Sequence, residues 1–270
     1  MKISLRNLWI LLLAVALTCC DSAKADYSTQ DDPKKESKKK KNSKKEEAAS
    51  TEVEIVKKWE LPAILTEVSG IAYLGKDQFA CVQDEAGLIF IYNTATRKIE
   101  RQITFGAAGD YEGIALVDHT AFVVRSEGKL FEIEDFLSAN PRIKTHTTSL
   151  TAQQNVEGLT YDATNNRLLL AIKGKEKNTS GFKGIYAFDL KTKKLLPDPV
   201  IKVNLTDPLL APQKSKKLEK AFQPSEIGIN PKTGTILVTE GSNPQLFTLK
   251  PNGKIEARYK LSSSDFPQPE

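Results

Sequence analysis

From residue 53 to the C-terminus, apolar and β-branched residues recur in short runs that are separated by turn-forming residues. Apolar and polar positions alternate within many of these runs, which is typical of strands with one buried face. In the first unit the predicted strands cover residues 70–74, 78–83, 88–93 and 98–104. The second unit repeats them at residues 113–117, 121–124, 130–133 and 143–148. The pattern therefore predicts an all-β chain built from a repeated four-strand unit.

The same short signature opens each unit. Its copies are Val68-Ser69-Gly70-Ile71-Ala72, Tyr111-Glu112-Gly113-Ile114-Ala115, Val156-Glu157-Gly158-Leu159-Thr160, Pro224-Ser225-Glu226-Ile227-Gly228 and, at the last residues, Pro269-Glu270. The first three copies are about 45 residues apart, which is the length of one β-propeller blade. A β-sandwich would not repeat one four-strand unit behind a recurring signature. We therefore predict a β-propeller of about five four-stranded blades, with about six as the alternative, over residues 53–270.

Three features depart from the regular repeat. Residues 53–59 could supply the outer strand of the last blade, but its inner strands are missing after Glu270. Either the last blade is truncated at the C-terminus, which we predict, or the ring closes irregularly. Residues 173–183 lengthen the loop after the second strand of the third unit. Residues 204–222 form a longer insertion before the fourth unit and are predicted to contain a helical turn or two. Long loops on a rigid scaffold often carry function.

The signatures also predict a cluster of carboxylates. In a propeller the innermost strand of each blade runs along the central channel, and the link from the preceding blade arrives at one end of it. We therefore expect one mouth of the channel to collect Glu112, Glu157, Glu226 and Glu270, with Ser69 in place of the first carboxylate. The loops after the second strands add, at greater radius, Asp84, Glu85, Ser126, Glu127, Glu240 and Ser242. Ser69, Asp84, Glu85, Glu127 and Glu240 are candidate secondary ligands of a metal ion.

Carboxylates that share one mouth repel each other, and the sequence is compatible with several arrangements that would offset this repulsion. A calcium ion takes about six to eight oxygen ligands and tolerates irregular geometry. Burial and like charge would instead raise the pKa of one or more of the glutamates. A third arrangement has each glutamate bind backbone amides of a neighbouring blade and lock the blades together. In a fourth, two of them form a catalytic acid–base pair.

The N-terminus carries the features of an export signal. A basic start at residues 1–6 precedes an apolar stretch at residues 8–18, which is too short to span a bilayer. The following Leu17-Thr18-Cys19-Cys20 resembles a bacterial lipobox, with Leu17 in the required place before Cys20. We therefore predict a signal peptide over residues 1–20 and lipidation of Cys20, which would anchor the protein to a membrane. The alternative is an ordinary cleaved signal with incidental cysteines.

Residues 21–52 are predicted to be a disordered tether rich in Lys and Glu. They contain almost nothing apolar, so they cannot bury enough surface to offset the entropy of the chain. Lysine runs can bind nucleic acid or anionic lipid. Here acidic residues flank the runs and no aromatic residues interleave with them. We therefore expect a solvated spacer and no nucleic-acid partner, despite the formal net charge of +5.

As an ordered set, the motifs resemble those of the SdiA-regulated (YjiK-like) family. The resemblance covers about residues 55–270. It is carried by Val68-Ser69-Gly70-Ile71, Val82-Gln83-Asp84-Glu85, Tyr111-Glu112-Gly113-Ile114-Ala115, Pro224-Ser225-Glu226-Ile227 with Asn230-Pro231-Lys232-Thr233-Gly234, and Phe266-Pro267-Gln268-Pro269-Glu270. The resemblance implies a five-bladed propeller similar to NHL-repeat proteins, with a calcium site at Glu112, Glu157, Glu226 and Glu270. It implies no reaction, and Ser69 departs from the pattern.

Two classes of function fit these features. The first is a membrane-anchored lipoprotein, exported to the cell envelope of a bacterium, whose calcium-binding propeller binds or scaffolds a small-molecule or protein ligand. The alternative is a calcium-dependent hydrolase of the lactonase or phytase kind, in which the metal polarises a carbonyl or phosphoryl oxygen. His119 and His146 are predicted to lie away from the mouth, and Cys81 is predicted to be a buried strand residue. No nucleophile elbow or phosphate-binding loop occurs, so we favour the binding module.

Overall fold

The computed structural model describes residues 53–177, 181–213 and 217–270. They belong to the second of the two units into which the chain divides, Glu47–Glu270. The predicted signal peptide, Cys20 and the tether therefore lie outside the described residues. No helix within the described part is long and apolar enough to cross a membrane.

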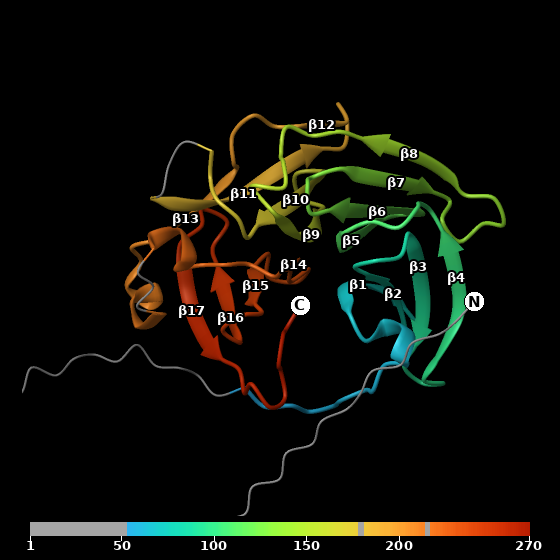
Figure 1. The fold of residues 1–270 in the computed structure, drawn as a ribbon, viewed down its shortest axis with the longest axis horizontal. Coiled ribbons are helices and arrows are strands. Elements are labelled where there is room, and N and C mark those ends of the chain that lie inside the picture. Colours follow the sequence, from blue (N-terminus) through green and yellow to red (C-terminus); the bar gives the residue numbers. More distant parts are fainter. Residues whose placement is uncertain (1–52, 178–180, 214–216) are drawn as a thin grey trace, which may run out of the picture. The chain divides into compact units, whose positions relative to one another are not determined.

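The strands pair antiparallel and mostly in chain order, and each sheet is one blade of a propeller (Figure 1). Blade 1 consists of β1 (Val68–Gly75), β2 (Gln78–Gln83), β3 (Leu88–Asn93) and β4 (Lys98–Thr104). Blade 2 consists of β5 (Tyr111–Val117), β6 (Thr120–Arg125), β7 (Leu130–Glu134) and β8 (Arg142–His146). Blade 3 consists of β9 (Val156–Asp162), β10 (Arg167–Ile172) and β11 (Phe182–Asp189), with β12 (Lys194–Leu195) and β13 (Ile201–Asn204) both paired to β11. Blade 4 consists of β14 (Glu226–Ile229), β15 (Ile236–Glu240), β16 (Gln245–Leu249) and β17 (Ile255–Lys260).

Three short 3₁₀ helices complete the regular structure of the described residues. The first, η1 (Ala63–Leu65), precedes blade 1. The other two, η2 (Pro208–Gln213) and η3 (Leu218–Lys220), lie in the insertion between blades 3 and 4, where the sequence predicted a helical turn or two. The end of this insertion joins the core, because the ring of buried Phe222 packs against that of Phe247 at 5.2 Å between centroids.

The predicted propeller is confirmed, but the predicted number of blades was wrong. The described residues form four blades rather than five or six. Residues 53–59, predicted as an outer strand, instead run as irregular chain. A strand needs a neighbour that pairs with its backbone groups, and the described residues hold no inner strands of a further blade with which this segment could pair.

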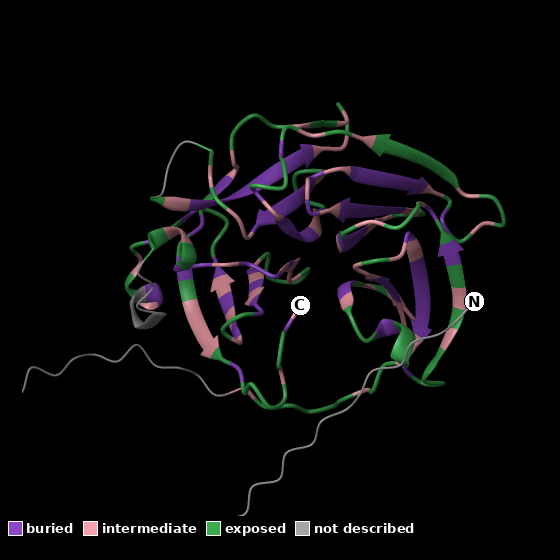
Figure 2. Ribbon diagram, viewed as in Figure 1, coloured by how far each residue is buried: buried purple, intermediate pink, exposed green. Residues whose placement is uncertain are grey.

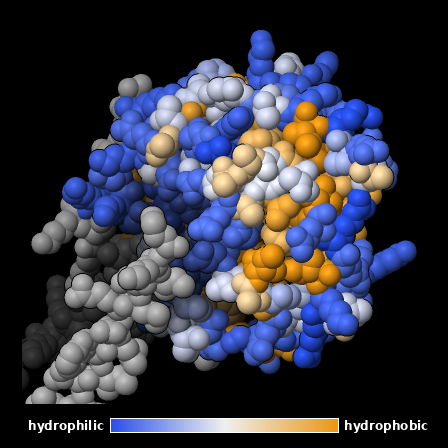
Figure 3. All heavy atoms as spheres, turned by 45° about the vertical axis from the view of Figure 1, so that its right-hand side comes forward, coloured by the Kyte–Doolittle hydropathy of each residue, from blue (hydrophilic) through white to orange (hydrophobic). Residues whose placement is uncertain are grey.

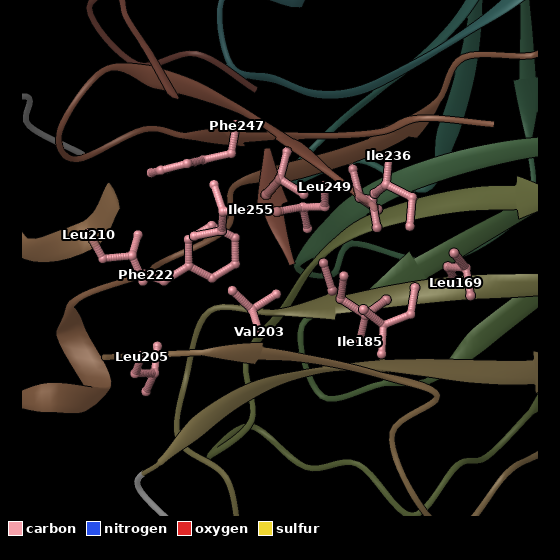
Figure 4. Close-up of a cluster of buried hydrophobic side chains, with 14 of the residues drawn as sticks. Leu169, Ile185, Val203, Leu205, Leu210, Phe222, Ile236, Phe247, Leu249 and Ile255 are labelled. Carbon is pink, nitrogen blue, oxygen red and sulfur yellow. The ribbon is translucent and has the colours of Figure 1, made fainter. Parts of the chain in front are cut away.

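The core lies between neighbouring blades, whose apolar faces pack together (Figure 2). Ile89 of blade 1 and Ile114 of blade 2 belong to one buried cluster. A second cluster joins blades 2 and 3. The third, which includes Leu169 and Phe247, joins blade 3 to blade 4 (Figure 4). Burial of these side chains holds each blade against the next, because apolar surface removed from water stabilises the fold.

The innermost strands approach each other closely at glycines of the signature. A Cβ on Gly113 would lie 2.9 Å from the backbone nitrogen of Leu159. A Cβ on Gly158 would lie 2.7 Å from the backbone nitrogen of Ile227. Only glycine leaves the space for such contacts, so the recurring glycine sets how tightly the inner strands surround the axis.

Candidate functional site

A cavity of about 370 Å³ opens at the ends of the inner strands. Its lining includes residues from three signatures, residues that follow the second strands of two blades, and the C-terminal segment. These are Ser69, Glu112, Glu157, Asp84, Lys173, Gln268 and Glu270. The structure thus brings together most of the carboxylates that the repeat predicted at one mouth, which we call the acidic mouth.

Glu226 occupies a different place from Glu112 and Glu157. Each signature glycine packs on the equivalent residue of the next blade: Gly70 on Gly113, and Gly158 on Glu226. Glu226 therefore stands at the glycine position, one residue out of register with the other glutamates. Its Oε1 accepts hydrogen bonds from the backbone N–H of Leu159 at 3.1 Å and of Ile227 at 2.7 Å. This carboxylate links blade 4 to blade 3, which is the blade-locking arrangement that the sequence left open.

Ser225, rather than Glu226, is the counterpart of Glu112 in the fourth signature. Ser225 Oγ donates to the carbonyl of Pro269 at 2.6 Å, and Ser69 Oγ donates to the carbonyl of Tyr111, also at 2.6 Å. Both serines are buried. Pro269 therefore corresponds to Tyr111, and Glu270 corresponds to Glu112. The fifth signature arrives at the mouth as predicted, although no strand follows it among the described residues.

Glu157 is held by an ion pair and a hydrogen bond. Lys173 Nζ lies 3.1 Å from Glu157 Oε2, and the side chain of Asn155 donates to Oε1. Burial raises the pKa of Glu157, while the Lys173 ammonium opposes the shift. Lys173 follows β10 at the position that Asp84 takes after β2, because the two strands pair with Gly158 and Gly70 in the same register.

Burial and like charge hold the other carboxyl groups in and beside the mouth toward their neutral, protonated form. Burial raises the pKa of Glu112 to about 8, and the neighbouring carboxylates of Glu157, Asp110 and Glu270 contribute to the rise. Burial also raises the pKa of Glu270 and, more strongly, that of Glu226. Raised pKa values in a cleft are typical of sites that take a proton, a cation or a substrate.

The side chain of Asp84 has a buried oxygen that lacks a hydrogen-bond partner among the described residues. Its backbone carbonyl accepts a hydrogen bond from Tyr111 N–H at 2.9 Å, which ties blade 1 to blade 2. Its side-chain Oδ1, however, is buried without a hydrogen-bond partner in the described part of the structure. A buried polar atom without a partner is costly and calls for an explanation such as an unseen water or ion.

The remaining candidate ligands lie outside the lining of the acidic mouth. Glu127 pairs with Arg125 at 3.1 Å, and Glu85 is exposed. Glu240 is buried and accepts hydrogen bonds from Gln223 N–H and from the side chain of Gln245, so it organises blade 4. Within residues 53–177, 181–213 and 217–270, no three His, Cys, Asp or Glu side chains are grouped closely enough to hold a metal ion between them.

Neither histidine lines the acidic mouth. His119 is exposed in the turn between β5 and β6. His146, at the end of β8, lies 2.7 Å from Glu132 Oε2, and Lys193 pairs with the same buried carboxylate. Burial also raises the pKa of the Cys81 thiol to about 12, which makes it a poor nucleophile, as the sequence predicted for a buried strand residue.

Sequence reasoning placed Lys173 near the mouth but missed its ion pair with Glu157. Lys183, at the other end of the same loop, was also expected near the mouth, but the sequence did not indicate that it is buried or that its Nζ donates to the carbonyls of Lys173, at 2.7 Å, and of Gly174. The only available signal was the position of Lys173 directly after a second strand. The loop of residues 173–183 is thus fastened at both ends to the edge of the site.

No protein-family model matches the chain, and no curated protein matches its sequence. Among solved structures it is similar to a protein of unknown function from Bacteroides caccae, with 16% identity, a TM-score of 0.42, and coverage of 66% of this chain and 56% of that chain. It is also similar to a protein of unknown function from Bacteroides thetaiotaomicron VPI-5482, with 12% identity, a TM-score of 0.47, and coverage of 71% and 43%.

A third similar structure is that of streptogramin B lyase, with 12% identity, a TM-score of 0.44, and coverage of 73% of this chain and 56% of that chain. The chain spans about half the length of the solved structures it matches. Likenesses this distant carry no argument about function, so the function is argued from the site.

Proposed function

We propose that this chain is a binding module whose acidic mouth takes a calcium ion. The observation that carries the proposal is the buried, unpartnered Oδ1 of Asp84 at the edge of a cavity lined by further carboxylates. A hard cation would satisfy this atom and neutralise its neighbours together. The resemblance to the SdiA-regulated (YjiK-like) family, which implies a calcium site, supports the same proposal.

The donor set suits calcium. Glu112, Glu157 and Glu270 would hold the ion, with Asp84 and Ser69 beside them, and all five offer oxygen. The hydroxyl of Ser69 donates its hydrogen bond to the Tyr111 carbonyl, so the lone pairs of its oxygen remain available to a cation. Because these side chains are not yet gathered into a cage, binding would draw them together and would compete with the Lys173 ammonium for Glu157. Calcium tolerates such irregular ligand sets better than magnesium does.

The test is a calcium titration of the folded unit by calorimetry, together with its melting temperature in calcium and in chelator. Calcium at about 100 times its dissociation constant should stabilise the unit by about 2.7 kcal/mol. The double variant Glu112→Gln/Glu157→Gln should lose this shift. Glu256→Gln, which removes a carboxylate from the outer strand β17, is the matched control and should keep it. No shift in the unaltered protein, or an equal shift in the double variant, rules the site out.

We further propose that the unit is carried on a membrane of the bacterial cell envelope by a lipid on Cys20. The basis is the lipobox-like Leu17-Thr18-Cys19-Cys20. Expression in a bacterium with a labelled fatty acid tests this directly. Cys20→Ser should abolish the label and release the protein from the membrane fraction, whereas Cys19→Ser should leave both unchanged. Labelling that survives Cys20→Ser would contradict this assignment.

A further inference from the structure

The acidic mouth already holds a cation that belongs to the chain. Lys173 is the basic residue among those that line the cavity, and its Nζ lies 3.1 Å from Oε2 of Glu157. The side chain of Asn155 donates to the other carboxylate oxygen, Oε1. Both oxygens of this buried carboxylate therefore have a partner before any ion arrives, and the Lys173 ammonium takes the place on Glu157 that a metal ion would need.

Hydrogen bonds within blade 3 fix the backbone that carries Lys173. Its N–H donates to the carbonyl of Asn155, and that of Gly174 donates to the carbonyl of Gln154, each at 2.8 Å. The ammonium of the buried Lys183 donates to the carbonyl of Lys173 at 2.7 Å. Blade 3 lies between blades 2 and 4, which pack against it from both sides (Figure 1). The ammonium of Lys173 is therefore presented to the mouth from a fixed base, which lowers the entropy lost in forming the ion pair.

Lys175, two residues further on, shows how an ordinary surface lysine of the same segment behaves. Its side chain is 60% exposed and lies 3.7 Å from Glu219, whereas the side chain of Lys173 is 28% exposed. The surface in Figure 3 is largely hydrophilic, which is where lysines usually lie. An exposed ion pair contributes little to stability. Removal of one partner from a buried pair is costly, because the other charge stays buried alone. Lys175 is therefore a matched control for Lys173.

We propose that Lys173 is a built-in competitor for the acidic mouth and sets the calcium concentration needed to fill it. The inference rests on the proposed calcium binding and deepens it. Calcium would have to displace the ammonium to gain Glu157 as a ligand, and the displaced side chain would turn to solvent. A monovalent cation brings no more charge than the ammonium it would displace, whereas calcium brings twice as much. Lys173 would thus reserve the mouth for a divalent ion.

The calcium affinity of the full chain, measured by calorimetry, tests the proposal in three variants. Lys173→Met removes the ammonium and nearly keeps the size of the side chain. This variant should bind calcium at least about ten-fold more tightly than the unaltered protein, a difference of ~1.4 kcal/mol. Lys173→Arg keeps the charge and should bind calcium no more tightly than the unaltered protein. The control Lys175→Met should leave the affinity unchanged.

The reaction of Lys173 with an amine-acylating reagent gives a second readout, which needs no variant. Mass spectrometry of peptides from the full chain measures the rate at each lysine. In chelator Lys173 should react more slowly than Lys175, because its ammonium is paired and less exposed. Saturating calcium should speed the reaction of Lys173, since the ion releases its side chain, and should leave the rate at Lys175 unchanged.

The outcomes separate this proposal from calcium binding itself. If calcium binds, equal or weaker binding by Lys173→Met overturns the competitor and leaves the calcium site standing. A rate at Lys173 that bound calcium does not change has the same meaning. Calcium binding by Lys173→Met but not by the unaltered protein supports the competitor in its strongest form, because the ammonium then closes the mouth. No binding by either protein excludes the calcium site, and the competitor with it.

Discussion

The two faces of blade 1 are covered by different parts of the protein. The face that includes Ile89 packs against blade 2 and is fully buried. On the opposite face, Phe90 is buried under η1 and its flanking chain, yet Ile71 on the inner strand is half exposed. The first face is closed by another blade, whereas the second, open face is covered among the described residues by short irregular segments. Apolar side chains are therefore most completely buried where one blade covers another.

The largest expected effect comes from truncating a side chain on the closed face. Ile89→Ala should lower the free energy of unfolding by about 2–5 kcal/mol, because it leaves a cavity between two blades. Ile71→Ala, on the open face, should change it by less than about 0.5 kcal/mol. Urea unfolding measures both. Similar losses for the two variants would show that the faces are energetically equivalent and would refute the contrast.

An intermediate effect is expected from adding a methyl group where inner strands meet. Gly113→Ala places a carbon 2.9 Å from Leu159 and should cost about 1–3 kcal/mol through overpacking. Gly228→Ala is the matched control on β14, where no atom lies within 4 Å of the added carbon. The control should be nearly neutral in thermal unfolding. A costly control would mean that the backbone conformation of the inner strands, rather than close approach, disfavours alanine.

A third expected effect concerns the pH dependence of stability. The pKa of Glu112 is about 8 in the folded protein against an ordinary 4.5, so the folded state keeps a proton that the unfolded state releases. This contribution is complete below pH 4.5 and is lost as the pH rises to about 8. The melting temperature should therefore fall less between pH 5 and pH 8 in Glu112→Gln than in the unaltered protein.

Glu157, Glu226 and Glu270 also have raised pKa values, so Glu112→Gln should reduce the fall without removing it. Glu256→Gln should keep the full pH dependence. An unchanged fall in Glu112→Gln would show that this carboxyl is not the group that resists ionisation. Added calcium should flatten the pH dependence in the unaltered protein if the ion binds at the mouth.

Local pattern was sufficient to determine the strands and their grouping. Runs of apolar and β-branched residues between turn-forming residues located β2, β3 and β4 at their observed ends, because the buried length of a strand must be apolar. The recurring signature also placed Ser69, Glu112, Glu157 and Glu270 at one mouth. Residues at the same place in each repeated unit occupy equivalent positions in each blade. This part of the site could therefore be predicted from the sequence alone.

Tertiary structure alone decided the rest. The number of blades depends on which faces find partners, and residues 53–59 remained irregular because no strand edge among the described residues pairs with them. The register of Glu226 depends on the packing of β14 against Gly158. The spacing of the signatures along the sequence does not define this register to within one residue. The hydrogen bonds from Leu159 N–H to Glu226 and from Ser69 to the Tyr111 carbonyl join residues 67 and 42 positions apart in the chain. Such contacts arise only when the blades are packed, because they depend on distances in space and not along the sequence.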